Sequence, residues 1–271
     1  MASRRGPATV VPHSLQPAGD CPPDLQGLLS FVDELHQKRS STWAWKHYKD
    51  TIWKLALLTK ARRVLEVGGG RWPLFSLEEI TQAGVSYVVN DISESELALA
   101  PAYFEKVCFD ISKPIGEEHQ ALLGTVDLMF SQMVFEHVSD AVRAYQNVHA
   151  LLAPGGVCLN FHPVLYSVPF VVNWLLPEAL SSRILRLFDP KRRPDEVPKH
   201  PARYDLCVIR KSIRNRLSAI GYRRVWQVPF WYHDYFMKIP GVYQLDHAAA
   251  AMADRNNWTG FASFSYTLVA K

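Results

Sequence analysis

Short apolar runs alternate with amphipathic stretches through the middle of the chain. Runs of this length are typical of buried strands, and the stretches between them have the spacing of helices that cover a sheet. Strands are predicted at 63–67, 85–90, 106–109, 126–130, 157–161, 223–230 and 261–270, and helices between the first five at 73–83, 93–101, 115–123 and 139–152. The pattern predicts an α/β fold with a doubly wound, mainly parallel seven-stranded sheet and helices on both faces. The closing strands are expected to pair antiparallel at the sheet edge.

The same pattern divides the chain into three parts. Residues 1–23 contain five prolines and few large apolar side chains, which predicts a disordered arm. Residues 24–60 are predicted to form a helical N-terminal cap, its second helix covering 43–58. Residues 61–271 are predicted to form one Rossmann-like domain, with a lid inserted after the fifth strand at 163–205. An amphipathic helix that ends at Gly221 and a helical insert at 242–255 complete the prediction.

Composition and charge narrow the function classes. The chain is 48% hydrophobic and 21% charged, as in globular proteins, and its four cysteines form no CxxC pair. A disulfide framework and a metal site are therefore not expected. We expect a reducing, cytoplasmic location and no membrane span. Residues 191–224 contain eleven basic and three acidic side chains, a net charge of +8, whereas the remainder has a net charge of −4. An acidic partner or substrate is expected to meet the protein at that segment.

Glycines and carboxylates follow three successive strands. The first predicted strand ends in Gly68-Gly69-Gly70, the second in Asp91 and the third in Asp110. In an open α/β sheet, ligands bind beyond the carboxyl ends of the strands. Bare glycine backbone admits a ligand closely, and a carboxylate accepts two hydrogen bonds from a ribose diol. These residues together predict a nucleoside pocket.

Four sequence blocks resemble those of class I S-adenosylmethionine (SAM)-dependent methyltransferases, of the type 11-like group that acts on small molecules. The blocks are 64–70 (VLEVGGG), 89–93 (VNDIS), 127–138 (DLMFSQMVFEHV) and 151–156 (LLAPGG). The similarity is strong over residues 50–162 and looser over 223–270. It implies a SAM cofactor bound at the predicted nucleoside pocket.

The resemblance also implies a role for each cofactor-site residue. Gly68, Gly69 and Gly70 would hold the methionine part of SAM, supported from beneath by Glu66. Asp91 would bind the ribose hydroxyls and Ile92 would lie against the adenine. The adenine edge would be flanked by Asp110 and Ile111, and the pocket floor lined by Ser131 and Gln132.

The glycine loop departs from the family pattern at one position. Trp72 stands where relatives usually have another glycine, so the loop must swing or the indole must point away. The neighbouring Arg71 is a candidate partner for the methionine carboxylate. Pro73 is predicted to be the first residue of the next helix, where its missing N–H costs nothing.

Three histidines are candidate catalytic bases. His137 follows the fourth predicted strand, His162 follows the fifth, and His233 lies beyond the sixth beside Asp234. A histidine titrates near neutral pH and can take a proton from a hydroxyl or an amine. A base is needed only if the methyl acceptor is protonated.

The sequence thus predicts methyl transfer from SAM to an oxygen or nitrogen atom of a small molecule, with an acidic and partly apolar acceptor favoured. Alternatives are a binding protein that keeps the fold without turnover and an RNA methyltransferase, the latter suggested by the basic segment. A dinucleotide oxidoreductase is disfavoured because Pro73 occupies the third glycine position of GxGxxG. The oligomeric state is not predicted.

Overall fold

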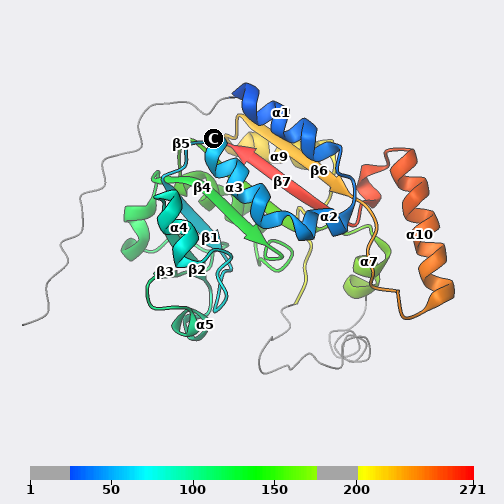
Figure 1. The fold of residues 1–271 in the computed structure, drawn as a ribbon, viewed down its shortest axis with the longest axis horizontal. Helices are drawn as coiled ribbons and strands as arrows, with labels where there is room; N and C mark the ends of the chain where they lie inside the picture. The colour runs from blue at the N-terminus through cyan, green and yellow to red at the C-terminus, as the bar shows by residue number, and fades with distance from the viewer. Residues whose placement is uncertain (1–24, 176–200) are drawn as a thin grey trace, which may run out of the picture.

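The computed structural model describes residues 25–175 and 201–271, which contain a seven-stranded sheet in the order β3-β2-β1-β4-β5-β7-β6 (Figure 1). The strands are β1 (Arg63–Val67), β2 (Ser86–Asp91), β3 (Glu105–Cys108), β4 (Val126–Gln132), β5 (Leu152–Pro163), β6 (Arg224–Phe230) and β7 (Phe264–Ala270). Strands β1 to β5 pair in parallel, and β7 runs antiparallel to both β5 and β6. The predicted fold class is confirmed. The predicted arm, 1–23, and the greater part of the predicted lid lie outside the described residues.

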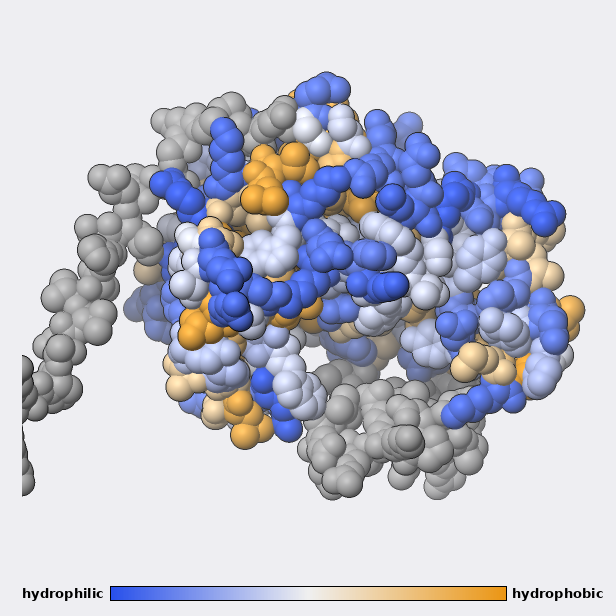
Figure 2. All heavy atoms as spheres, in the orientation of Figure 1, coloured by the Kyte–Doolittle hydropathy of each residue, from blue (hydrophilic) through white to orange (hydrophobic). Residues whose placement is uncertain are grey.

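Helices lie on both faces of this sheet. Figure 1 shows α1 and α3 in front of the strands and α9 behind them. The helices are α1 (Leu25–His36), α2 (Ser41–Lys46), α3 (Tyr48–Leu58), α4 (Leu77–Ala83), α5 (Glu94–Leu99), α6 (Ala141–Leu151), α7 (Val168–Leu175), α9 (Lys211–Ile220) and α10 (Pro240–Arg255), with short 3₁₀ turns η1 (Glu117–Leu122) and η2 (Thr259–Phe261). In the view of Figure 2, apolar side chains form small separate clusters within a largely hydrophilic surface.

The helix predicted at 43–58 is two helices, α2 and α3, that meet at His47. The His47 backbone has φ −108° and ψ 16°, outside the helical range, so the chain changes direction between α2 and α3. Tyr48, Ile52 and Leu55 are buried as their spacing predicts, while Trp45 keeps 41% of its surface exposed. The Tyr48 hydroxyl donates to the Ser131 carbonyl at 2.8 Å, which fixes this cap to the end of β4.

Helix α4 begins four residues later than predicted, so the expected role of Pro73 is wrong. Ser76 caps the helix: its hydroxyl accepts from the Glu79 N–H, and the Glu79 carboxylate accepts from the Ser76 N–H. This reciprocal pair satisfies two end groups of the helix, which a proline at position 73 could not do. Residues 68–75 are consequently a longer loop at the end of β1.

Strand β5 is longer than predicted, and this changes the place of His162. The strand runs to Pro163, where His162 pairs with Ser265 and Pro163 with Phe264 of β7. His162 therefore lies within the sheet instead of following it. At the other end of this region, α9 ends at Gly221 with φ 124°, as predicted.

No helix in the described ranges is both long enough and apolar enough to cross a membrane. Within residues 25–175 and 201–271, no group of three or more histidine, cysteine, aspartate or glutamate side chains is arranged to hold a metal ion.

Candidate active site

The register of the parallel strands places the predicted cofactor residues at one edge of the sheet. Val67, the last residue of β1, pairs with Asn90 on one side and with Ser131 on the other. The glycine bend that follows Val67 is therefore flanked by Asp91 at the end of β2 and Gln132 at the end of β4. Carboxyl ends of adjacent parallel strands form the usual ligand site of an open α/β sheet.

Asp91 faces the glycine bend directly. The N–H groups of Gly68 and Gly69 donate to the Asn90 carbonyl at 2.8 and 3.1 Å, which holds the bend against the end of β2. A Cβ atom at Gly70, whose φ is +47°, would lie 3.2 Å from Asp91 Oδ2. The bare backbone of Gly70 and the Asp91 carboxylate thus face each other. This arrangement fits a ribose with a charged tail beside it.

The other two glycines are required by close packing. A Cβ at Gly68, which has φ +78°, would lie 2.4 Å from the Val134 side chain. A Cβ at Gly69 would lie 2.7 Å from Val89 and 3.0 Å from the Glu66 carboxylate. Any side chain here would displace β2 or the segment after β4. The triple glycine is thus explained by packing as well as by a ligand.

Glu66 lies under the bend and fixes the loop that leaves it. Its Oε2 atom accepts from the Leu74 N–H at 3.0 Å and from the Tyr87 hydroxyl. Burial raises the pKa of the Glu66 carboxyl to about 7, opposed by the Tyr87 hydrogen bond. Glu66 therefore positions the loop and is itself 8% exposed.

Arg71 is engaged beside the bend, and Trp72 points away from it. The Arg71 guanidinium makes two hydrogen bonds to the Glu96 carboxylate on α5, at 2.6 and 2.5 Å. It also lies 5.3 Å from the Trp72 ring centre. The Trp72 side chain is 69% exposed, so the indole points outward and does not fill the glycine bend.

The residues predicted to surround the adenine differ in exposure. Ile92 is 62% exposed just beyond Asp91, whereas Ile111 is buried and its carbonyl accepts from the Asn147 side chain at 2.7 Å. Asp91 Oδ1 accepts from the Ser93 N–H at 2.9 Å. Asp110 Oδ1 accepts from the N–H and the hydroxyl of Ser112 at 2.8 and 2.6 Å. Ile92 therefore offers open apolar surface beside Asp91.

The end of β4 forms the floor next to the bend. Ser131 is buried and its hydroxyl donates to Asn160 Oδ1 at 2.8 Å, while Gln132 is half-buried. Met133 then takes a left-handed conformation with φ 57°, and its N–H donates to the Phe161 carbonyl at 2.8 Å. This turn brings Val134 onto Gly68.

The three candidate bases lie in different surroundings. His137 is half-exposed, with Nδ1 3.1 Å from the Pro201 carbonyl and Nε2 3.7 Å from the Glu136 carboxylate. His162 is fully buried, and its ring nitrogens are bonded to the Pro163 carbonyl at 2.9 Å and the Thr267 hydroxyl at 2.8 Å. Burial lowers the pKa of the His162 imidazole to about 4. As a base, His162 would have to break these contacts.

His233 is paired with a carboxylate that the sequence did not indicate. Its Nε2 atom is 3.2 Å from Asp246 on α10, whereas the adjacent Asp234, the possible partner in the sequence, is exposed. Asp246 is thirteen positions further along the chain, and only the return of α10 brings it to His233. His137, His162 and His233 do not form one group.

Two residues of the site were missed in the sequence. Glu96 engages Arg71 and became a candidate only once α5 was placed beside the loop. Glu136 is buried next to His137, and burial raises the pKa of its carboxyl to about 8. Its carbonyl accepts from the N–H groups of Arg203 and Tyr204, so this residue holds the chain where it returns after the insert. Its place in the 127–138 block was the available signal.

Comparison with known proteins agrees with this geometry. Residues 65–158 match the protein family described as Methyltransferase domain, a range that runs from β1 into β5 and includes the glycine bend, Asp91 and Ser131. No curated protein is similar enough in sequence to match the chain.

Several solved structures are similar to this chain. Phosphoethanolamine N-methyltransferase 2 of Haemonchus contortus, in complex with phosphomonomethylethanolamine and S-adenosylhomocysteine, is 12% identical with a TM-score of 0.50, over 89% of this chain and 60% of that one. The CMeT domain of citrinin polyketide synthase is 16% identical with a TM-score of 0.50, over 85% and 52%. A SAM-dependent methyltransferase from Archaeoglobus fulgidus is 16% identical with a TM-score of 0.49, over 83% and 94%.

Proposed function

Because the chain is a class I SAM-dependent methyltransferase, we propose that it transfers the methyl group to an oxygen or nitrogen atom of a small molecule. When bound, SAM would supply a methyl group on a positively charged sulfur atom: an acceptor in line with the carbon–sulfur bond takes the methyl group, and S-adenosylhomocysteine leaves as a neutral thioether. The protein's part is to hold donor and acceptor in that line and to exclude water. The observation that supports the proposal is the place of the Asp91 carboxylate, 3.2 Å from where a Cβ of Gly70 would lie.

We assign the cofactor contacts to residues around that contact. Asp91 accepts from the ribose hydroxyls, and Gly68 to Gly70 lie along the methionine part. The exposed Ile92 covers one adenine face, and Asp110 with Ile111 borders its edge. Ser131 and Gln132 form the floor, and Glu66 acts through the loop it holds by Leu74.

Arg71 is proposed to bind the methionine carboxylate. In this structure its guanidinium is engaged by Glu96 at 2.5 Å, so carboxylate binding requires Arg71 to share or exchange that partner. A planar guanidinium has five N–H donors and can serve two carboxylates at once. Glu96 and the methionine carboxylate would then compete for the charge of Arg71.

Among the three histidines, His137 is proposed as the base for a protonated acceptor. It is half-exposed at the end of the 127–138 block, whereas His162 is fully buried with both ring nitrogens bonded. The neutral imidazole accepts a proton through one nitrogen while the other holds a fixed partner. For His137, that fixed partner is the Pro201 carbonyl at 3.1 Å.

The acceptor is proposed to be acidic and partly apolar. Basic side chains line the outside of α9, where Arg210, Lys211 and Arg214 lie close together in sequence, and α7 offers the apolar Val168 and Val172 at its surface. These two elements follow β5 and precede β6, on either side of the insert. An anionic group near α9 with an apolar body along α7 matches that pairing of charge and hydrophobicity.

Calorimetric titration tests the cofactor site. We expect SAM and S-adenosylhomocysteine to bind at micromolar concentrations and NAD not to bind. Asp91→Ala should weaken SAM binding about tenfold or more, because charge-assisted hydrogen bonds are each worth ~1.5–3 kcal/mol. Glu94→Gln, three residues further on and exposed in the first turn of α5, is the matched control.

The acceptor class is tested with methyl-deuterated SAM in a cell extract separated into small molecules, RNA and protein. The proposal predicts label in the small-molecule fraction, and its loss with Asp91→Ala. Label confined to RNA, with steep loss of binding as salt is added, would instead identify a nucleic-acid methyltransferase. Tight SAM binding without label in any fraction would favour a binding protein.

A further inference from the structure

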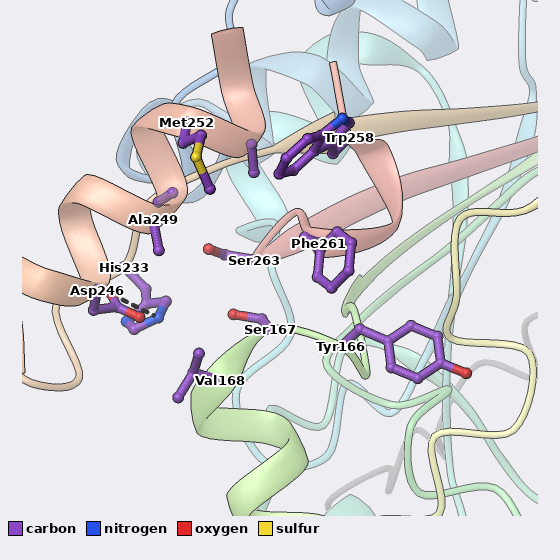
Figure 3. A pocket seen from close by; sticks show the side chains of 12 residues that line it. Tyr166, Ser167, Val168, His233, Asp246, Ala249, Met252, Trp258, Phe261 and Ser263 are labelled. Atoms are coloured by element: carbon purple, nitrogen blue, oxygen red, sulfur yellow. Dashed lines mark ion pairs between the residues drawn. The ribbon is translucent and has the colours of Figure 1, made fainter. Parts of the chain in front are cut away.

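A second pocket lies at the same edge of the sheet, well away from the glycine bend. It is a cavity of about 210 Å³ between the start of α7, the segment after β6, α10 and the segment 258–263 (Figure 3). Strands β4, β5 and β7 lie between β1, which leads into the bend, and β6, which leads into His233. The cavity holds about seven water molecules at ~30 Å³ each, enough for a compact organic group.

The floor of this pocket is polar and buried. The side chains of His233 and Asp246 are 3% and 8% exposed, and their nearest atoms, Nε2 and Oδ2, are 3.2 Å apart. His233 Nδ1 has no hydrogen-bond partner among the described residues, and Asp246 Oδ2 has only the His233 Nε2 atom close to it. Figure 3 shows the hydroxyl groups of Ser167 and Ser263 pointing toward this side of the pocket. A buried nitrogen without a partner leaves an interaction that a ligand can complete.

The rim of the pocket is apolar and open. Val168, Met252, Trp258 and Phe261 line it and remain between 47% and 59% exposed. Aromatic rings at the mouth and hydrogen-bonding groups at the base suit a molecule with a polar head and an apolar body. The head would enter first, because the unpartnered nitrogen lies at the base.

The charged groups at the base of the pocket indicate the charge of the polar group that it would bind. No lysine or arginine is among the twelve residues that line the pocket. Arg210 stacks on the Tyr166 ring at 4.7 Å, and Arg39 donates to the Asp254 carbonyl of α10 at 2.6 Å. Among the described residues, the basic side chains within 4.0 Å of the Asp246 carboxylate are two histidines, His233 at 3.2 Å and His247 at 4.0 Å. Burial lowers the pKa of His233, and the carboxylates of Asp246 and Asp234 act in the opposite direction.

A buried carboxylate beside a histidine whose charged form is disfavoured by burial lacks a fixed positive charge. A ligand ammonium group supplies that charge, and its N–H groups match the oxygen atoms of Asp246 and the free Nδ1 of His233. Trp258 and Phe261 at the rim add an aromatic surface to which cations are attracted.

We propose that this pocket binds a small ammonium compound, with its charged nitrogen against Asp246 and His233 and its apolar body along Trp258 and Phe261. The proposal does not rest on the assignment of the cofactor site, because the two groups of residues share no member. It also gives His233 a binding role, distinct from the base predicted from its position in the sequence.

The test uses benzylammonium as the probe, with benzyl alcohol and benzoate as neutral and anionic compounds of similar shape. Titration calorimetry on the full chain is expected to give a dissociation constant on the order of 1 mM or tighter for benzylammonium. Benzyl alcohol should bind at least about tenfold more weakly, and benzoate not measurably. Equal binding of benzoate would overturn the proposal.

Two variants locate the binding. Asp246→Asn keeps the shape and removes the charge, and should weaken benzylammonium about tenfold or more. Ala250→Phe fills the cavity and should abolish binding. Asp234→Asn, next to His233 but exposed, is the control and should bind like the wild type. Unchanged affinity in either pocket variant, with an unfolding midpoint that shows the variant is folded, would refute the site.

Two further measurements separate this proposal from the methyltransferase assignment. They also show whether the bound ammonium compound is a methyl acceptor or a separate effector. Asp91→Ala should bind benzylammonium normally even where SAM binding is lost. Incubation with SAM followed by mass spectrometry then asks whether the probe is N-methylated. Methylated product makes the pocket part of the acceptor site, whereas binding without product identifies a site for a separate effector; each result supports the ammonium pocket.

Discussion

The hydroxyl of Tyr87 on β2 donates a hydrogen bond to the carboxylate of Glu66 on β1, beneath the loop that forms the candidate cofactor site. The same carboxylate accepts from the Leu74 N–H, so one buried side chain joins two strands and the loop. Burial of this carboxylate has a cost that depends on pH, because the folded protein favours its protonated form.

Stability should therefore fall as pH rises through the titration of Glu66. The folded pKa is about 7 and the ordinary value is 4.5, so between these the unfolded state binds fewer protons. That contribution to the unfolding free energy is lost on going from pH 4.5 to 7, by up to about 3 kcal/mol. Urea unfolding of Glu66→Gln and wild type at pH 5 and pH 8 checks this. The difference between the two proteins should change by about 2–3 kcal/mol between these pH values, whereas with the exposed Glu94→Gln it should not.

His162 should act in the opposite direction. Its folded pKa is about 4 against an ordinary 6.5, so between these values the unfolded state binds more protons. Stability should be lost as pH falls from 6.5 to 4, by up to about 3 kcal/mol from this residue. Between pH 6.5 and pH 4, His162→Gln should lose less thermal stability than the wild type. The partly exposed His47→Gln is the control and should lose as much as the wild type. Equal acid sensitivity in His162→Gln would mean that His162 is not held neutral.

The cofactor-site residues at the ends of β1 and β2 could be predicted from the sequence because their signals are local. Gly68 to Gly70 and Asp91 each follow an apolar run, and parallel pairing of β1 with β2 then brings them together. Pro73 misled because proline is favoured at a helix start, yet the reciprocal Ser76–Glu79 cap is the stronger signal and lies three residues further on. The three-residue spacing of Ser76 and Glu79 marks the start of α4.

The pairs that involve distant segments could not be predicted in the same way. His233 meets Asp246 only because α10 folds back over the end of β6, and the nearer Asp234 was the natural choice from sequence. His162 was expected beyond its strand because the apolar run stops at Phe161, but pairing with β7 continues through Pro163. Backbone pairing extends a strand past its apolar residues, and no single-chain pattern reports the partner.

The glycine bend offers a matched pair of substitutions. Gly70 and Gly84 both have left-handed backbones, with φ of +47° and +65°, so alanine at either should cost about 1–2 kcal/mol of stability. Only at Gly70 would the added Cβ meet a site residue, 3.2 Å from Asp91 Oδ2, since Gly84 has nothing within 4 Å. SAM binding should weaken about tenfold or more in Gly70→Ala. Equal SAM affinity in the two variants would separate the bend from the cofactor.

Arg71 provides a test that distinguishes a contact with the cofactor tail from a purely structural pair. If its guanidinium binds the methionine carboxylate, Arg71→Ala should weaken SAM about tenfold, the loss expected for a charge-assisted hydrogen bond. Methylthioadenosine, which lacks that carboxylate, should bind both proteins equally. Glu96→Gln is the paired variant, because it removes the charge that engages Arg71 at 2.5 Å and keeps the side-chain shape. SAM should then bind at least as tightly as to wild type, since Arg71 no longer divides its charge between two carboxylates. Parallel losses for SAM and methylthioadenosine in both variants would instead show that the Arg71–Glu96 pair only holds the loop against α5.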